Sequence, residues 1–88
     1  MGTIIKFMWY VYVILCQDWS LYTGISDDPE RRFRDHLAGE GGRYTRSHKP
    51  ARLVYKKKVG DKSEALRKEI EVKRWSRAKK IKTLGLKI

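Results

Sequence analysis

The sequence has a single cysteine, Cys16, among its 88 residues. One cysteine cannot form an internal disulfide, which is typical of the reducing cytoplasm, and we expect that location. The two histidines stand twelve residues apart, and no Cys/His spacing of a zinc site is present. The longest apolar run, residues 8–16, is too short to cross a bilayer, so we expect no membrane partner.

Acidic residues are scarce in the second half of the chain. Residues 43–88 contain seventeen Lys/Arg and four Asp/Glu, whereas residues 1–42 contain four Lys/Arg and six Asp/Glu. The net charge of +11 is therefore concentrated in one half, which favours a polyanionic partner, with nucleic acid ahead of an anionic membrane. A solvated lysine surface that serves solubility is the alternative that charge alone leaves open.

The length allows one small domain with one apolar core. We expect a lead-in segment over residues 1–8, a domain over residues 9–80 and a basic C-terminal tail over residues 81–88. Two runs rich in tyrosine and β-branched residues predict a β-hairpin over residues 9–25. Alternation along its first strand places Tyr10, Tyr12 and Ile14 on one face.

A helix is predicted over residues 29–38, because it begins at an Asp-Pro pair and ends at a glycine. Phe33 and Leu37 lie four residues apart and are predicted to form its apolar face. Arg32 and His36 share a neighbouring stripe that flanks this face.

The rest of the chain predicts three further elements. A short helical turn or loop is expected over residues 43–49, and a strand over residues 52–59. A capping box predicts a last helix over residues 61–77. The order indicates a small α+β fold, and the inward-facing residues predicted for the third strand are Leu53, Tyr55 and Val59.

Glu69 lies in an unusual position on the last predicted helix. At about 100° per residue it falls between Ala65 and Leu66, within an apolar arc that Ile70 and Val72 extend. A carboxylate on an apolar face costs free energy unless a partner meets it. That partner is either a basic side chain, for which an arginine is expected, or a divalent cation such as Mg²⁺.

Four more side chains have both an ordinary and a chemical interpretation. Tyr12 and Tyr22 suit core packing, but a phenol also binds phosphate, or acts as a base if its pKa falls. Arg32 can hold a phosphate through two hydrogen bonds, and His36 can exchange a proton near neutral pH. Together with Glu69 and the basic second half, the set fits metal-assisted phosphodiester cleavage.

In this order and spacing the residues resemble the GIY-YIG nuclease superfamily, and within it the compact stand-alone bacterial single-domain members. Residues 11–13 (Val-Tyr-Val) match the first motif, and residues 22–24 (Tyr-Thr-Gly) match the second. The arginine of the family falls on Arg32, with His36 one turn later, and its metal-binding glutamate falls on Glu69. Nearly the whole chain is covered by the resemblance.

The resemblance implies a three-stranded antiparallel sheet flanked by helices, in the order β-β-α-(short α)-β-α. It also implies a single Mg²⁺ or Mn²⁺ on Glu69. By analogy Tyr12 activates water or metal hydroxide, Tyr22 and His36 assist, and Arg32 binds the scissile phosphate.

Two departures from the family pattern concern the hairpin. The first motif lacks its usual glycine and isoleucine, although Tyr12 is present, whereas the second motif keeps its structural Gly24. Trp19 occupies the turn, where relatives commonly have glycine.

The implied function is a metal-dependent endonuclease that hydrolyses DNA, with branched, damaged or single-stranded DNA in repair or recombination as candidate substrates. The alternative is a catalytically weak DNA- or RNA-binding module of the same fold. We expect a monomer, and a separate partner protein for targeting. The side chains expected to contact backbone phosphates are Arg43, Arg46, Lys49, Lys73 and Arg77.

Overall fold

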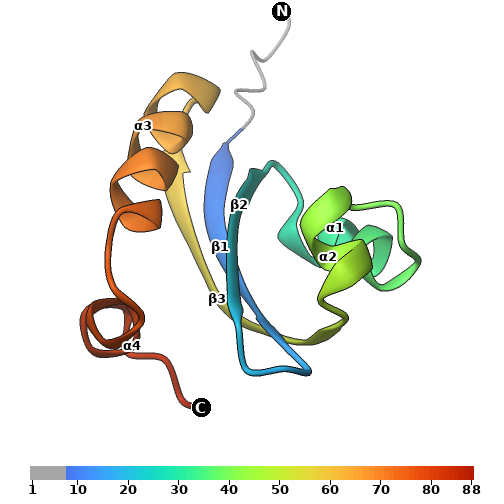
Figure 1. Cartoon of the computed structure of the whole chain (residues 1–88). Helices are drawn as coiled ribbons and strands as arrows, with labels where there is room; N and C mark the ends of the chain where they lie inside the picture. Colours follow the sequence, from blue (N-terminus) through green and yellow to red (C-terminus); the bar gives the residue numbers. More distant parts are fainter. Residues whose placement is uncertain (1–7) are drawn as a thin grey trace, which may run out of the picture.

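A computed structural model describes residues 8–88, in which three strands form one antiparallel sheet with helices on both faces (Figure 1). The predicted lead-in segment lies outside the described residues except for Met8. Among residues 8–88, none of the helices has the length and apolar composition that a membrane span requires. The elements are β1 (Trp9–Cys16), β2 (Leu21–Ser26), α1 (Pro29–Leu37), α2 (Arg43–Ser47), β3 (Pro50–Gly60), α3 (Lys62–Lys73) and α4 (Arg77–Leu84).

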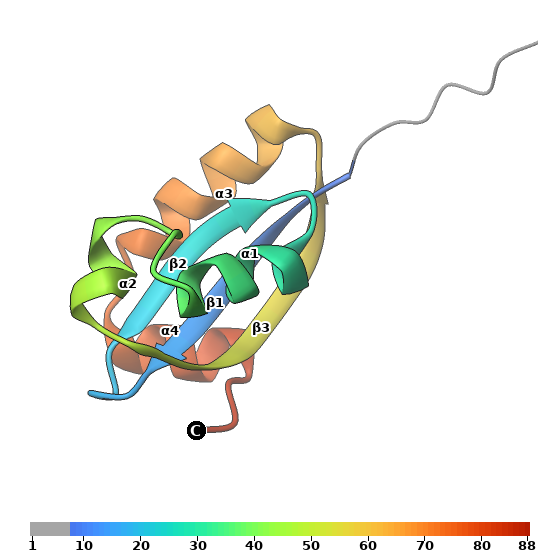
Figure 2. The ribbon, with the colours of Figure 1, turned by 90° about the vertical axis from the view of Figure 1, so that its right-hand side faces the viewer.

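The strand order is β2-β1-β3, so the predicted hairpin forms one side of the sheet and β1 is its central strand. Helix α1 packs on one face of the sheet and α3 on the other, which buries every residue from 11 to 16. Figure 2 shows α1 in front of the sheet and α3 behind it, beyond β2. The predicted α+β fold with an antiparallel sheet is confirmed.

The third strand is longer than expected and its register is irregular. Val13 pairs with Tyr55, whereas the next residue, Ile14, pairs with Leu53. Because neighbouring residues of β1 face opposite sides, Leu53 and Tyr55 face opposite sides too. Both are partly buried, as predicted, but they do not share one inward face.

Helix α1 begins and ends as predicted, but its buried face is different. The side chain of Asp28 accepts a hydrogen bond from the backbone of Arg31, and Gly39 adopts a φ of 80° after the helix. His36 is 1% exposed and lies at the centre of the buried face, whereas Leu37 is 54% exposed. The prediction that His36 only flanks this face was wrong, because both of its ring nitrogens have buried hydrogen-bond partners.

Helix α3 has the predicted capping box, formed by Asp61 and Glu64. It ends at Lys73 rather than at residue 77, because Ser76 accepts a hydrogen bond from the backbone of Lys79 and so starts α4. The basic end of the chain therefore contains a helix, followed by the buried side chain of Leu86.

The buried face of α3 is narrower than the predicted apolar arc. Ala65 and Val72 are completely buried, whereas Leu66 and Ile70 are 40% and 52% exposed. Glu69 lies on the buried side, and its side chain is only 15% exposed. The interpretation of Glu69 as a partly buried carboxylate is confirmed.

Candidate active site

Tyr12, on the central strand, forms the floor of the candidate site. It is 1% exposed and pairs across the sheet with Gly24 of β2. A Cβ atom at Gly24 would lie 2.5 Å from the hydroxyl oxygen of Tyr12, closer than real side chains approach. The second motif therefore requires glycine because the phenol ring of the first motif lies across it.

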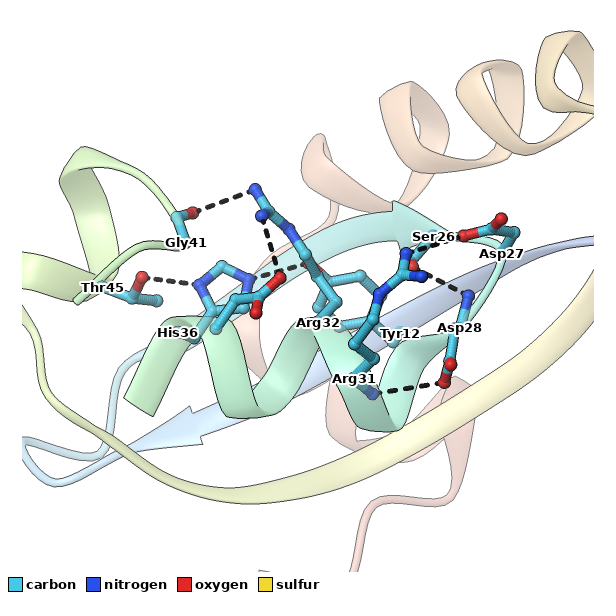
Figure 3. A network of polar contacts seen from close by, with 10 residues as sticks. Tyr12, Ser26, Asp27, Asp28, Arg31, Arg32, His36, Gly41 and Thr45 are labelled. Carbon is cyan, nitrogen blue, oxygen red and sulfur yellow. Dashed lines mark hydrogen bonds and ion pairs between the residues drawn. The ribbon is translucent and has the colours of Figure 1, made fainter. Parts of the chain in front are cut away.

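The Tyr12 hydroxyl begins a buried chain of hydrogen bonds (Figure 3). It lies 2.8 Å from Nε2 of His36, and Nδ1 of His36 lies 2.6 Å from Oγ1 of Thr45 on α2. In a neutral imidazole one ring nitrogen donates and the other accepts, so the ring can link these two hydroxyl groups. Gly41 lies against the ring, where a Cβ atom would collide with it.

Burial determines the protonation of both groups. Burial raises the pKa of the Tyr12 phenol well above its ordinary value, and the nearby phenol of Tyr22 raises it further, while the charge of Arg32 opposes the shift. Burial also lowers the pKa of His36 from 6.5 to about 4, and the charge of Arg32 lowers it too. At neutral pH the phenol is protonated and the imidazole is uncharged, so Nε2 of His36 can accept a hydrogen bond from the phenol.

Arg32 lies beside this pair on α1 and is held loosely. One of its guanidinium nitrogens lies 3.4 Å from the carbonyl oxygen of Gly41, and another lies 3.6 Å from Asp35. Both distances are long for hydrogen bonds, and the Arg32 side chain is 37% exposed. Arg32 can therefore turn toward an incoming phosphate at little cost.

A series of aromatic rings connects the buried histidine with the surface. The ring of Tyr22 lies 4.9 Å from that of His36 and 5.6 Å from that of Tyr44. Tyr44 in turn stacks on His48 at 4.1 Å. Tyr22 is also 6.3 Å from Tyr12, so both motif tyrosines belong to one aromatic cluster.

Glu69 lies on the partly buried side of α3. Its negative charge contributes to the raised pKa of Tyr12, so the carboxylate acts electrostatically on the buried phenol. Its ion-pair partner is Lys73, one turn later, with 3.4 Å between Oε2 and Nζ, rather than an arginine. In the described part of the chain no three His, Cys, Asp or Glu side chains gather to hold a metal ion. A cation on Glu69 would take its other ligands from water and substrate, which suits Mg²⁺.

The GIY-YIG catalytic domain family matches residues 8–82 of the chain. The chain belongs to the GIY-YIG family. Its relatives include a UPF0213 protein of Cupriavidus necator, which is 50% identical over 72 residues that cover 82% of this chain and 78% of the relative. A UPF0213 protein of Staphylococcus saprophyticus is 45% identical over 76 residues, which cover 86% of this chain and 93% of the relative.

Two solved structures have the same fold. The solution NMR structure of a UPF0213 protein from Bacillus halodurans superimposes with a TM-score of 0.56 at 44% identity, over 89% of this chain and 83% of that one. The solution NMR structure of a protein from E. faecalis gives a TM-score of 0.62 at 34% identity, over 97% and 88% of the two chains. The resemblance noted from the sequence is confirmed, and the family supports a nuclease-type function.

Four of the five residues that match the GIY-YIG motifs lie together in the structure. Tyr12, Tyr22, Arg32 and His36 form one cluster on the α1 face of the sheet, and the charge of Glu69 acts on it from α3. Their roles in the reaction stay predictions.

The predicted phosphate-binding residues are spread more widely than the motif residues. Arg43 and Arg46 lie on α2 and Lys49 follows it. Arg46 and Lys49 line a hollow of about 340 Å³ that His36 and Thr45 also line. The remaining two already have partners, because Lys73 pairs with Glu69 and Arg77 donates a hydrogen bond to the carbonyl oxygen of Trp19.

Sequence reasoning missed three residues of this GIY-YIG site. Thr45 accepts from or donates to His36, Gly41 makes room for the imidazole, and Tyr44 continues the aromatic series. The sequence signal was the hydroxyl-rich stretch over residues 43–49, which follows a run of glycines. It indicated a turn, but it did not indicate that this turn contacts α1. A partner of His36 nine residues away cannot be identified from helical spacing.

Proposed function

We propose that this GIY-YIG protein is a divalent-metal-dependent endonuclease that hydrolyses DNA phosphodiester bonds, as a monomer in the cytoplasm. The observation that carries the proposal is the buried hydrogen bond of 2.8 Å between Tyr12 and His36, with Arg32 and Tyr22 beside it. Family membership supports a nuclease-type function for this arrangement.

Tyr12 and His36 act together as the base. A free phenolate is disfavoured, because burial raises the pKa of Tyr12, whereas His36 is uncharged at neutral pH. The phenol oxygen takes a proton from the attacking water while its own proton passes to Nε2 of His36; because burial also disfavours the imidazolium that forms, this relay needs a water whose own pKa has been lowered. Nδ1–H then donates to Thr45, which fixes the tautomer that this transfer needs.

Arg32 binds the scissile phosphate. Its two long contacts, to Gly41 and Asp35, are exchanged for two charge-assisted hydrogen bonds to phosphate oxygens. The guanidinium then stabilises the negative charge that develops on the phosphate during attack.

Glu69 would hold the Mg²⁺ or Mn²⁺ ion, with waters and phosphate oxygens as the other ligands. When bound, the ion polarises the phosphate and lowers the pKa of a coordinated water. Lys73, whose side chain is 52% exposed, would then be available to contact the DNA backbone. Tyr22 packs against His36 and keeps the imidazole in place.

The basic residues determine how the DNA lies on the surface. The candidate substrates are branched, damaged or single-stranded DNA in repair or recombination, with a partner protein supplying the targeting. Contacts to phosphate give affinity without base specificity, so they fit a nuclease of low sequence preference. The proposed contacts are Arg43, Arg46, Lys49, Lys73 and Arg77.

The alternative is a catalytically weak DNA- or RNA-binding module of the same fold. One observation favours it: Glu69 already has a cationic partner, Lys73, at 3.4 Å. In that module the ion pair is structural and the carboxylate needs no metal.

The test is cleavage of labelled single-stranded, duplex and branched DNA by the wild-type protein in Mg²⁺, in Mn²⁺ and in EDTA. The endonuclease proposal predicts products with a divalent cation and none in EDTA, with the preferred DNA identifying the substrate. Salt-sensitive binding of the same DNAs without products in any of the three buffers would favour the binding module instead.

A further inference from the structure

Trp19, in the turn between β1 and β2, has an unusual combination of exposure and backbone conformation. Its φ is 70°, and it is the only residue other than glycine with a positive φ among residues 8–88. It is also 62% exposed. A left-handed conformation costs free energy for any residue with a Cβ atom, and glycine or asparagine would form the turn with less strain.

The turn is held by its backbone, so the indole ring is not needed to form it. The Trp19 amide donates to the carbonyl oxygen of Cys16, 2.9 Å away, and the side chain of Asp18 accepts hydrogen bonds from Ser20. Arg77 of α4 donates to the Trp19 carbonyl oxygen. In both views the turn and α4 lie at the same end of the molecule (Figures 1 and 2). A strained, exposed side chain that the fold does not use indicates a function outside the fold.

The indole lines a shallow groove with the chemistry of a nucleobase site. The groove has a volume of about 220 Å³, too small for a large ligand but suited to a single planar group. Trp19 gives it an aromatic surface for stacking, and Gln17 and Arg52 are its polar lining residues; one guanidinium nitrogen of Arg52 donates to the carbonyl oxygen of Lys87, which leaves its other N–H groups for a ligand. The other lining residues are Leu15, Cys16 and Ala51.

The charge around the groove fits a polyanionic ligand. Arg52 lines it, and Arg77 is tied to the backbone of Trp19. Lys49 is also held near the turn, because its carbonyl oxygen accepts a hydrogen bond of 2.7 Å from the amide of Gln17. Asp18 is the acid of the turn, and it lies 3.8 Å from His48.

We infer that Trp19 is a stacking platform for an unpaired base of the DNA strand that the active site engages. This inference rests on the proposed function and narrows its substrate to DNA with an unpaired segment. Inside a duplex both faces of a base are already stacked, so an indole can stack only on a base that has left the helix. Trp19 precedes Tyr22 by three residues, so their Cα atoms lie at most about 11 Å apart, and the platform belongs to the same hairpin as both motif tyrosines.

The test compares wild-type protein with Trp19→Gly and Trp19→Phe in EDTA, so that binding is measured without cleavage. The probes are a fluorescein-labelled oligothymidylate and a blunt duplex of the same length. Glycine removes the ring and relieves the backbone strain, so the variant folds; thermal denaturation verifies this. Leu66→Ala, which removes an exposed apolar side chain from α3, is the matched control.

We expect Trp19→Gly to bind the single strand at least about five-fold more weakly, and the duplex within about two-fold of wild type. Trp19→Phe should recover most of the difference, and Leu66→Ala should show none. Unchanged affinity of Trp19→Gly for the single strand, or an equal loss on both probes, overturns the inference.

The outcomes separate the inference from the proposed function. If Trp19→Gly selectively loses affinity for the single strand but the wild-type protein cleaves no DNA, the stacking platform is supported and the endonuclease proposal is contradicted. A wild-type protein that binds neither probe overturns both.

Discussion

The buried His36 makes the stability of the fold depend on pH in a calculable way. In the unfolded chain its pKa is the ordinary 6.5, whereas burial lowers it to about 4 in the folded protein. As the pH falls below about 7 the unfolded chain takes up a proton that the folded protein does not, so the free energy of unfolding decreases. These two pKa values give a loss of about 2 kcal/mol between pH 7 and about pH 5, with the loss continuing toward pH 4.

Between pH 7 and pH 5 the effect of His36 is separated from that of the carboxylates whose pKa the fold lowers. These exposed carboxylates, Asp18 and Glu30, titrate below this range. Denaturant unfolding at pH 7, 6 and 5 measures the loss in wild type and in His36→Gln, which has no imidazole at this position. The control Leu37→Ala removes the exposed neighbouring side chain and should keep the wild-type pH dependence.

The comparison uses pH dependence rather than absolute stability, because His36→Gln also loses packing and hydrogen bonds. Between pH 7 and pH 5 we expect the free energy of unfolding to decrease by about 2 kcal/mol more in wild type than in His36→Gln. Parallel curves would refute the argument that His36 is uncharged because it is buried between Tyr12 and Thr45.

Two further predictions concern the residues around this histidine. Gly24→Ala places a Cβ atom 2.5 Å from the Tyr12 hydroxyl and should lower the free energy of unfolding by about 1–3 kcal/mol, measured by denaturant titration. If the variant were as stable as wild type, the phenol would not lie over Gly24. Arg32→Lys should lower the DNA cleavage rate about 100-fold, because lysine keeps the charge but cannot hold a phosphate through two parallel hydrogen bonds. Arg31→Lys, on the same helix with a side chain 57% exposed, should cleave at nearly the wild-type rate, and an equal loss in both variants would contradict a specific role for Arg32.

The order of strands and helices could be predicted from local patterns because each signal acts over a few residues. The caps at Asp28 and Asp61 fix where α1 and α3 begin, and each depends on a backbone amide three residues away. The end of α3 was missed for the opposite reason. The predicted helix continues to residue 77, whereas the chain uses Ser76 to begin a new helix.

The candidate site was predicted only in part, because burial depends on partners from other elements. Apolar periodicity ranks Leu37 above His36 for burial, yet Tyr12 and Thr45 supply the hydrogen bonds that make the histidine the buried residue. The position of Glu69 on the buried side of α3 was readable from helical spacing. Its partner, Lys73, lies one turn later and was readable from the same spacing, but an arginine was expected instead.

We propose that DNA cleavage needs both the carboxylate of Glu69 and a divalent cation. Glu69→Gln keeps the size of the side chain and removes its charge. Glu71→Gln makes the same change two residues later on α3, where the side chain is 55% exposed and pairs with Lys68, away from Tyr12.

Cleavage of the preferred DNA by the two variants, beside wild type in Mg²⁺ or Mn²⁺, is therefore the most direct test. We expect Glu69→Gln to fold and bind DNA but to give no product, and Glu71→Gln to cleave like wild type. Cleavage by Glu69→Gln at the wild-type rate would contradict this proposal.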